Sequence, residues 1–259
     1  MDYGLIGEKL GHSYSRIIHE MIADYSYELH PVSKDDFDEF MTKKPFKAIN
    51  VTIPYKQAVI PYLDGLDDNA RAIGAVNTIV CEDGRYIGHN TDYAGFRYMI
   101  DKYNVDIKGR KVLVLGKGGA SKAIIAVLKD LQAGDILTVY YKDAPDTITY
   151  EECFARHSDA DVIINTTPVG MYPDSDATPI DLAPFTSCKA VLDIIYNPIE
   201  TVLVRDARKL GMTGATGLEM LVAQAVYASE FFQNKKLCAS DTEYTQLIDK
   251  VTAEVAKEL

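Results

Sequence analysis

The sequence lacks several features that mark whole classes of protein. Its apolar runs fall well short of the ~20 residues that cross a bilayer, so we expect no membrane span. Met1 leads directly into a strand-like segment, so we expect no signal peptide and a cytoplasmic protein. The cysteines form no CxxC pair and, with the histidines, show no metal-ligand spacing. We therefore expect no metal and no disulfide framework, and buried thiols at Cys81, Cys153, Cys188 and Cys238.

The sequence also has fewer basic than acidic residues. The chain has 27 Lys and Arg against 38 Asp and Glu, a net charge of −11. This balance argues against nucleic acid and anionic membranes as partners, and an anionic substrate would need a local binding group. No internal repeat or low-complexity segment is present, and 259 residues are enough for two domains.

A strand, a glycine turn and a helix follow one another between residues 111 and 129. Residues 111–115 are nearly all apolar, as in a parallel strand buried on both faces. The turn that follows lets a pyrophosphate approach the backbone and the N-terminal amides of the helix at 120–129. Its glycines are Gly116, Gly118 and Gly119. The pattern predicts a mononucleotide-binding unit, with an ordinary strand-to-helix turn as the alternative.

The residues that follow strengthen this prediction. Ser121 stands where the fingerprint has a third glycine or alanine, and serine is small enough to keep helix and strand close. Apolar runs at 136–141 and 161–165, separated by a polar helical segment, complete a βαβαβ order. With a further buried strand at 190–195, we expect a Rossmann dinucleotide-binding domain over residues 93–217.

Strands and helices also alternate ahead of the glycine turn, which predicts a second α/β domain over residues 1–92. The expected strands or extended segments are 2–7, 27–31 and 48–53, and the expected helices are 16–24, 34–41 and 93–103. Helices at 218–232 and 241–257 are expected to return to this domain, so residues 218–259 belong with it.

A hairpin is predicted between residues 75 and 92. Asp83-Gly84 is among the strongest short-range hairpin signals. If these are the two turn residues, Asn77 lies opposite Asn90 and Asp92 sits one step further. Polar side chains should therefore gather at one end of the hairpin. In the 218–232 helix, Gln224 lies off the apolar stripe, and a buried amide there would need a partner.

A series of short motifs, in this order and spacing, resembles the shikimate dehydrogenase family over almost the whole chain. They are Gly11–Ser15, Asn50–Lys56, Gly74–Thr78, Asn90–Asp92, Gly116–Ser121, Asn165–Met171, Tyr196–Pro198 and Gly217–Ala225. The resemblance implies reversible reduction of 3-dehydroshikimate to shikimate with NADPH, a step of chorismate and aromatic amino acid biosynthesis. It also implies a split N-terminal α/β catalytic domain, completed by C-terminal helices, beside a Rossmann domain, in a monomer or homodimer.

Lys56 is the residue we expect to act as acid and base. Reduction of a ketone develops negative charge on oxygen, and an ammonium group within reach stabilises that charge and supplies the proton. Taken alone, a lysine after a strand-ending proline would simply be solvated. The resemblance implies the catalytic role and makes Asp92 its partner. The alternative for Asp92 is a helix N-cap.

The resemblance implies a set of substrate-binding residues: Ser13, Ser15, Thr52, Asn77, Thr91, Tyr196 and Gln224. Ser13 and Ser15 would hold the carboxylate, with the Tyr196 hydroxyl nearby. The alternative for the two serines is capping of the helix that follows them. Asn50 is a further candidate, and His12 is expected to fix its loop and is given no role.

NADP is the expected cofactor, with NAD possible. Its expected contacts are Gly116, Lys117, Gly118, Gly119, Ala120, Ser121, Lys142, Thr166, Gly217 and Met220. The chain departs from the family at Lys117, where alanine is common, and at Tyr141-Lys142-Asp143, where Asn-Arg-Thr is usual. Lys142 is a point-charge partner for a 2′-phosphate, whereas Asp143 would repel it. We therefore expect a weakened NADP preference.

Two other functions are kept as alternatives. A quinate dehydrogenase of the same fold, or one acting on both substrates, would use almost the same residues, with NAD as its cofactor. A non-catalytic nucleotide-binding or regulatory module would be expected to lose Lys56 or Asp92, and both are present. A folate-type dehydrogenase of related fold would not need Ser13 and Ser15.

Overall fold

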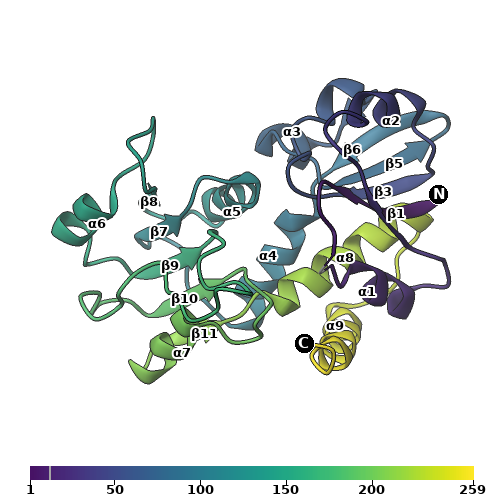
Figure 1. Ribbon diagram of the computed structural model, residues 1–259. Helices are drawn as coiled ribbons and strands as arrows, with labels where there is room; N and C mark the ends of the chain where they lie inside the picture. Colours follow the sequence, from purple (N-terminus) through teal and green to yellow (C-terminus); the bar gives the residue numbers. More distant parts are fainter. Residues whose placement is uncertain (12) are drawn as a thin grey trace. The chain divides into compact units, whose positions relative to one another are not determined.

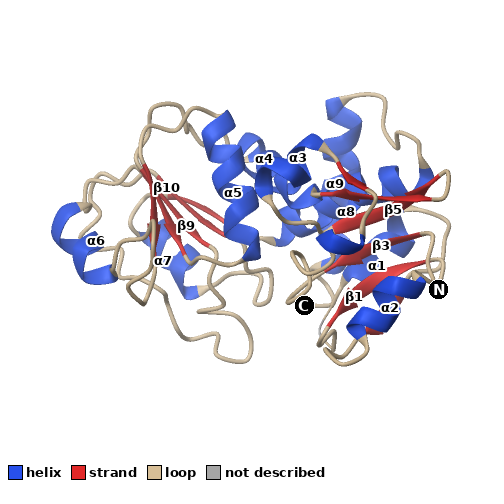
Figure 2. Cartoon of the chain, turned by 90° about the horizontal axis from the view of Figure 1, so that it is seen from above, coloured by secondary structure: helices blue, strands red, loops and turns tan. Residues whose placement is uncertain are grey.

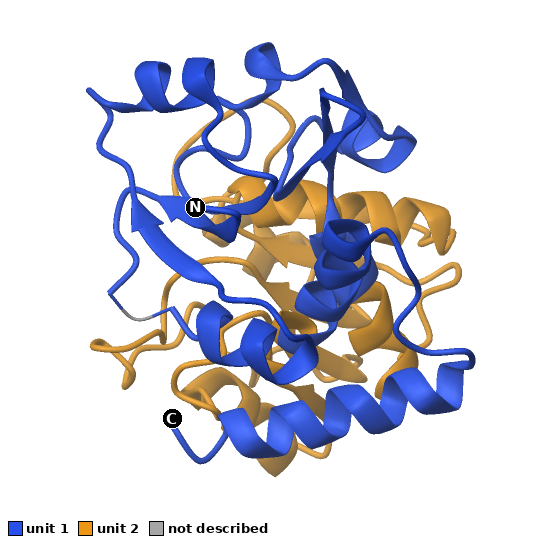
Figure 3. Cartoon of the chain, turned by 90° about the vertical axis from the view of Figure 1, so that its right-hand side faces the viewer, with its two compact units in different colours: residues 1–95, 222–258 blue, residues 96–221, 259 orange. Residues whose placement is uncertain are grey.

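Residues 1–11 and 13–259 are described by the computed structural model, and they form two compact units (Figure 3). Unit 1 contains Met1–Gly95 and Val222–Glu258, and unit 2 contains Phe96–Leu221 with Leu259. The chain leaves unit 1 within helix α4 (Thr91–Lys102) and returns within helix α8 (Leu218–Gln233). Unit 1 is therefore built from both ends of the chain.

Unit 1 contains a six-stranded sheet ordered β2-β1-β3-β5-β6-β4 (Figure 1). The pairs β1–β2, β1–β3 and β4–β6 are parallel, whereas β3–β5 and β5–β6 are antiparallel. The strands are β1 (Tyr3–Gly7), β2 (Glu28–Pro31), β3 (Ala48–Val51), β4 (Gly65–Leu66), β5 (Thr78–Glu82) and β6 (Arg85–His89). Its further helices are α1 (Ser15–Ile22), α2 (Phe37–Lys43), η1 (Ile60–Tyr62), α3 (Asp68–Ile73) and α9 (Asp241–Val255).

Neighbouring residues on three strands of this sheet face opposite sides, as the period of two requires. Ile6, Ile49 and Ile79 pack with residues of α2 and α3 on one side. Their sequence neighbours Leu5, Ala48 and Val80 pack on the other side with Phe232 of α8. Helix α9 lies against α1. C-terminal helices therefore complete the core that the N-terminal strands begin.

The β5–β6 hairpin forms in the predicted register. Thr78 pairs with His89 and Glu82 with Arg85, which leaves Asp83 and Gly84 in the turn with φ of 50° and 79°. Positive φ at both central residues is the geometry that an Asp-Gly hairpin turn favours. Beyond the last ladder pair, the Asn77 N–H donates to the His89 carbonyl at 3.1 Å. The prediction that polar side chains gather at this end is confirmed.

Unit 2 contains a five-stranded parallel sheet ordered β11-β10-β9-β7-β8 (Figure 1). Figure 2 shows its strands in red, with β9 and β10 labelled. Its strands are β7 (Val112–Leu115), β8 (Ile136–Val139), β9 (Val162–Asn165), β10 (Ala190–Asp193) and β11 (Thr213–Ala215), and its further helices are α5 (Gly119–Asp130), α6 (Tyr150–Arg156) and α7 (Val202–Lys209). After β8, the chain crosses back to pair β9 with the other side of β7. The carboxyl ends of β7 and β9 therefore form the switch point where such sheets bind ligands.

Several predicted element boundaries were wrong. The predicted strands at 48–53, 136–141 and 190–195 each end two residues earlier, because the apolar sequence continues after the ladder pairing stops. The predicted helix at 34–41 lies at Phe37–Lys43 instead, since the Asp36 N–H and carboxylate both bond Ser33 Oγ and form a turn.

Other differences concern short elements and thiols. The elements η1, β4 and α3 were not predicted, because segments of two to six residues carry too little periodicity. Cys153 and Cys188 are buried as expected, but Cys81 and Cys238 are only half-buried. Within the described residues, no helix has both the length and the apolarity for a bilayer crossing.

Asp193 is a buried carboxylate at the end of β10. It accepts hydrogen bonds from Asn165 Nδ2 at 3.0 Å, the Ile195 N–H at 3.0 Å and Thr201 Oγ1 at 2.8 Å. Burial disfavours the charged form more than these bonds favour it, and it raises the pKa of Asp193 to about 6. The native state therefore holds a proton at a pH where the unfolded chain has lost it.

We expect Asp193→Asn to flatten the pH dependence of stability between about pH 4 and 6. In the wild type, the free energy of unfolding should fall as the pH rises through this window, by on the order of 3 kcal/mol. Asparagine keeps an oxygen for Asn165 and Ile195 and can donate its amide to Thr201, so the fold should persist. Denaturant titrations of both proteins across this window measure the difference. A stability difference that stays constant with pH would contradict the assignment.

Candidate active site

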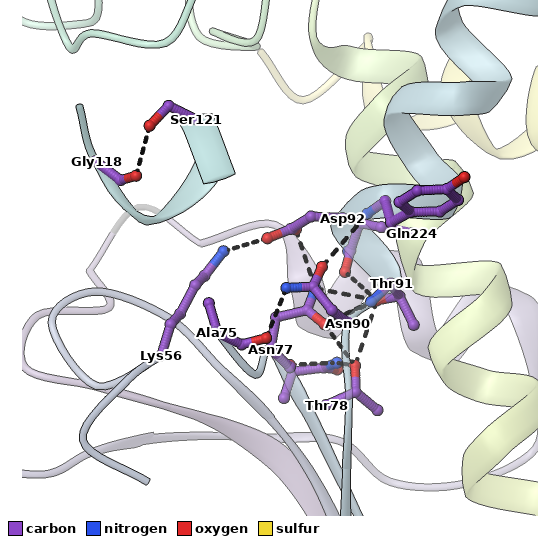
Figure 4. A network of polar contacts seen from close by, with 12 residues as sticks. Lys56, Ala75, Asn77, Thr78, Asn90, Thr91, Asp92, Gly118, Ser121 and Gln224 are labelled. Carbon is purple, nitrogen blue, oxygen red and sulfur yellow. Dashed lines mark hydrogen bonds and ion pairs between the residues drawn. The ribbon is translucent and has the colours of Figure 1, made fainter. Parts of the chain in front are cut away.

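Lys56 and Asp92 form a close ion pair at the polar end of the hairpin (Figure 4). Lys56 Nζ lies 2.6 Å from Asp92 Oδ2, and the side chains are 16% and 10% exposed. The turn after β3 carries Lys56, whose carbonyl accepts from the Val76 N–H at 2.7 Å. Asp92 lies in the first turn of α4, where the helix dipole favours a negative charge. The pair is thus anchored from two elements.

The capping alternative for Asp92 is wrong. Asn90 Oδ1 accepts from the Tyr93 N–H at 3.4 Å, so Asn90 caps the first turn of α4. Asn90 is itself held, because its amide donates to the Ala75 carbonyl at 2.9 Å. The carboxylate of Asp92 is therefore left to Lys56 and to other side chains of the site.

Asn77 joins Asp92 to Thr91. Its Oδ1 accepts from the Thr91 N–H at 2.7 Å, while its Nδ2 donates to Asp92 Oδ1 and to Thr91 Oγ1, each at 3.0 Å. Thr91 Oγ1 in turn donates to Gln224 Oε1 at 3.3 Å. Gln224 is half-buried rather than buried, and this hydroxyl is a partner of its amide. The structure brings these three predicted residues together with Lys56 and Asp92.

Ser13 and Ser15 contact each other ahead of α1. Ser13 Oγ donates to Ser15 Oγ at 3.1 Å and accepts from the Ser15 N–H at 3.3 Å. The N-cap residue of α1 is Tyr14, which makes no side-chain capping bond. Neither serine is therefore the N-cap residue, although Ser13 Oγ accepts from the first N–H of α1. His12, between these residues and Gly11, lies outside the described residues.

The remaining predicted substrate residues, Thr52 and Tyr196, follow strands of different units. Thr52 follows β3 and is half-buried, and its methyl group occupies the space that a Cβ on Gly7 would need. Tyr196 belongs to unit 2, where it follows β10 and is half-buried. Asn50, the further candidate, is buried and accepts from the Tyr27 hydroxyl at 2.7 Å.

The glycine turn of unit 2 has the geometry of a phosphate-binding loop. Gly116 has a φ of 104°, and a Cβ there would lie 2.8 Å from Thr166 Oγ1. A Cβ on Gly118 would meet nothing within 4 Å, so the space beside this residue at the start of α5 is open. Ser121 Oγ donates to the Gly118 carbonyl at 2.7 Å and steadies the loop. Open space beside N-terminal helix amides fits a pyrophosphate group.

The residues around this turn have distinct surroundings. Gly119 and Ala120 form the start of α5, and Thr166 Oγ1 donates to the Leu115 carbonyl at 2.6 Å. A side chain on Gly217 would overlap the Ile194 backbone, so this position requires glycine for steric reasons. Met220 is buried on α8. A contact of any of these with a cofactor stays a prediction.

Lys117 and Lys142 lie at the two loops that follow β7 and β8. Lys117 Nζ donates to the Pro145 carbonyl, so it links the glycine turn to the loop after β8. Lys142 Nζ lies 4.9 Å from the centroid of the Tyr141 ring, whose residue is 67% exposed. The hydrogen bond with Tyr141 raises the pKa of Lys142, which therefore stays charged. Asp143 is exposed.

Comparisons with known proteins show the family to which the chain belongs. The family model described as "Shikimate dehydrogenase substrate binding domain" matches residues 5–79. A protein named shikimate dehydrogenase (NADP(+)) from Clostridium beijerinckii is 40% identical over 94% of this chain and 95% of its own. The chain belongs to the shikimate dehydrogenase family. A second shikimate dehydrogenase (NADP(+)), from Clostridium perfringens, is 39% identical over 93% of this chain and 95% of its own.

Solved structures of this family have the same fold. A chorismate mutase/shikimate 5-dehydrogenase fusion protein from Clostridium acetobutylicum superposes with a TM-score of 0.88 at 37% identity, over 99% of this chain and 97% of its own. Shikimate 5-dehydrogenase from Thermus thermophilus, in complex with NADP(H) and shikimate, gives 0.83 at 25% identity, over 97% and 99%. The predicted α/β fold with a Rossmann-type domain is confirmed. These relatives give no support to the quinate or regulatory alternative.

Some residues of the site were not predicted. Thr78 bonds Asn77, Asn90 bonds the Ala75 carbonyl, and Tyr27 bonds Asn50, yet none of the three was assigned a role from the sequence. The hairpin register carried a signal for Asn90, because it lies opposite Asn77. No local signal pointed to Tyr27, since its contact with Asn50 spans 23 positions.

Proposed function

We propose that this protein catalyses the reversible reduction of 3-dehydroshikimate to shikimate with NADPH. The observation that supports this most is the Lys56–Asp92 pair, with its nitrogen and oxygen 2.6 Å apart, among amide and hydroxyl groups in a member of the shikimate dehydrogenase family. An ammonium group oriented by a carboxylate is what reduction of a carbonyl needs beside the oxygen.

The chemistry divides between cofactor and chain. Bound NADPH would supply a hydride to the carbonyl carbon of the substrate. Lys56 would donate a proton to the carbonyl oxygen as the electron pair of the C=O bond moves onto it, leaving a neutral amine. Asp92 would hold the amine in place throughout. In the oxidation direction, Lys56 would take the hydroxyl proton instead.

Other residues would bind and orient the ring. Asn77, Thr91 and Gln224 present amide and hydroxyl groups next to Asp92, and these suit the ring hydroxyls of the substrate. Ser13 and Ser15 would bind the carboxylate, with Thr52 and Tyr196 as further contacts. A carboxylate clasp of two hydroxyls, without an arginine, predicts moderate affinity in a protein of net charge −11.

We expect Ser13→Ala and Ser15→Ala each to raise the KM for shikimate roughly 10-fold, because each removes a hydrogen bond to a charged group worth ~1.5–3 kcal/mol. The value of kcat should change little. Ser33→Ala, which removes a serine hydroxyl from a turn of the same unit, is the matched control. An unchanged KM in both variants would remove the serines from the substrate site.

The activity itself is tested by following reduced nicotinamide absorbance with shikimate and with quinate, each with NADP and with NAD. We expect turnover with shikimate and NADP to exceed the other three combinations. Higher kcat/KM with quinate would overturn the substrate, and no turnover with any pair would overturn the function. The monomer or homodimer state and the cytoplasmic location stay predictions.

We expect a preference for NADP that depends on Lys142. Its charged amine follows β8, the position from which Rossmann domains contact the ribose, and a lysine attracts a 2′-phosphate. Lys142→Ala should lower kcat/KM for NADP by roughly 10-fold, because it removes one charged contact to the 2′-phosphate, and should spare NAD. Asp143→Ala should raise kcat/KM for NADP.

Lys129→Ala, which removes a lysine from the last turn of α5, controls for the change in net charge. Equal losses with both cofactors in the Lys142 variant would show that the residue does not discriminate between them. Better wild-type turnover with NAD would instead make Asp143 the ribose partner.

A further inference from the structure

A chain of buried side chains lies behind Asn77. The Tyr27 hydroxyl donates to Asn50 Oδ1 at 2.7 Å, Asn50 Nδ2 donates to Thr78 Oγ1 at 3.0 Å, and Thr78 Oγ1 donates to Asn77 Oδ1 at 3.1 Å. All four residues are buried, and Thr78 is wholly inaccessible. The last link continues to the active pair, because Asn77 Nδ2 donates to Asp92 Oδ1 (Figure 4).

The direction of this chain is fixed at both ends. Asn77 Oδ1 must face the Thr91 N–H, which can only donate, so its Nδ2 must face the Asp92 carboxylate. Asn50 Nδ2 also faces the Asn77 backbone carbonyl at 3.3 Å, which can only accept. Thr78 therefore accepts from Asn50, and its own proton goes to Asn77 Oδ1 at 3.1 Å, the shorter of its two contacts, since Thr91 Oγ1 lies at 3.3 Å. With this contact, every donor of the chain points toward Asp92.

Tyr27 begins the chain as a permanent donor. Burial holds the pKa of its hydroxyl well above the ordinary value, so the proton stays on oxygen. The His19 ring stacks on Tyr27, with centroids 4.0 Å apart and planes 9° apart. Burial lowers the pKa of His19 to about 3, so this ring is neutral. Hydrogen bonds aligned in one direction polarise one another, which strengthens the last link.

We propose that Tyr27 and Thr78 are positioning residues for the Lys56–Asp92 pair. Their hydroxyls hold the Asn77 amide so that its N–H donates to Asp92 Oδ1. Asp92 Oδ2 then remains available to accept from Lys56 and to orient its amine. Without the Thr78 hydroxyl, Asn77 Oδ1 keeps the Thr91 N–H and a longer contact of 3.3 Å with Thr91 Oγ1, and the amide gains freedom to rotate. This inference rests on the proposed function, because it assigns how the acid-base pair is oriented.

Thr78→Val is a clean probe of this role. Valine has nearly the shape of threonine, and Asn50 Nδ2 keeps the Asn77 carbonyl as an acceptor, so no amide is left without a partner. We expect kcat to fall roughly 10-fold, because one hydrogen bond is lost and a loss of ~1.4 kcal/mol corresponds to a factor of ten in rate. The KM for shikimate should stay within about 2-fold of the wild type. Thr78→Ser, which restores the hydroxyl, should recover most of kcat.

The matched control is Thr252→Val in α9, where the buried hydroxyl has no hydrogen-bond partner. It should leave kcat unchanged. Tyr27→Phe removes the first donor of the chain and should lower kcat in the same direction by a smaller factor. This second variant keeps the proposal testable if Thr78→Val is too unstable to assay.

A double-mutant cycle separates positioning from general structural damage. If Thr78 acts through Asp92, Thr78→Val should cost much less in an Asp92→Asn background than in the wild type. Equal losses in both backgrounds would overturn the proposal, as would an unchanged kcat in Thr78→Val and Tyr27→Phe. If the wild type does not oxidise shikimate at all, the proposed function fails, and that result is distinct from either of these.

Discussion

Replacing Lys56 with alanine is expected to lower kcat by at least ~100-fold, the usual contribution of a general acid or base. The residue meets the requirements for that role, because its amine is largely shielded from solvent and is held 2.6 Å from a single carboxylate oxygen. Substrate binding should stay within several-fold of the wild type, since the developing charge on oxygen exists only in the transition state. Steady-state kcat and KM, with a direct binding titration of shikimate, measure the two effects.

The Lys56→Ala experiment needs a stability measurement beside it. The change leaves the largely buried Asp92 carboxylate without its cationic partner, and removal of one partner from such a pair is destabilising. Thermal unfolding therefore has to show that the protein is folded at the assay temperature. Lys43→Ala, which breaks an exposed helix pair with Glu39, is the matched control. A near-normal kcat in folded Lys56→Ala would remove Lys56 from the chemistry.

Asp92→Asn is expected to lower kcat by roughly 10- to 100-fold with the fold intact. Asparagine keeps the shape of the side chain, and its oxygen can still accept from Asn77 Nδ2. What is lost is the charge that orients the Lys56 amine. Steady-state kinetics with shikimate and NADP measure the loss.

Asp101→Asn is the control for this second change, because Asp101 lies on the same helix and forms an exposed pair with Arg97. It should leave both kcat and KM unchanged. If Asp92→Asn alters KM alone, Asp92 binds a substrate hydroxyl without orienting Lys56. That result would contradict the acid-base pair and leave the family assignment standing.

The hairpin and the residues at its end were predicted best from the sequence, because they depend on the chemistry of a local turn. Asp83-Gly84 sets the hairpin, and the hairpin register then brings Asn77 beside Asn90 and next to Asp92. The same local reasoning missed which residue caps α4. Asn90 and Asp92 are both good capping residues, and a shift of two positions changes neither composition nor periodicity.

Contacts between distant segments could not be predicted from pattern alone. The Lys56–Asp92 pair was expected only through the family resemblance, because nothing in the local sequence distinguishes Lys56 from a solvated lysine. Thr78 was missed, since threonine is an ordinary strand residue, and two of its three polar neighbours, Asn50 of β3 and Thr91 of α4, come from other elements. Lys117 bonds the Pro145 carbonyl 28 positions away, a contact that no local pattern indicates, and its expected contact with phosphate stays a prediction.

The construction of unit 1 from both ends of the chain affects the order of folding during synthesis. Residues 96–221 are continuous, so unit 2 can fold while the ribosome is still adding residues. Unit 1 is completed later, because Phe232 and helix α9 are translated after the residues of unit 2. Until then the nascent strands of β1, β3 and β5 present Leu5, Ala48 and Val80 without their covering helix. Gln224 is translated in the same segment. A translation product that stops before this segment would therefore contain the nucleotide-binding domain and an incomplete site.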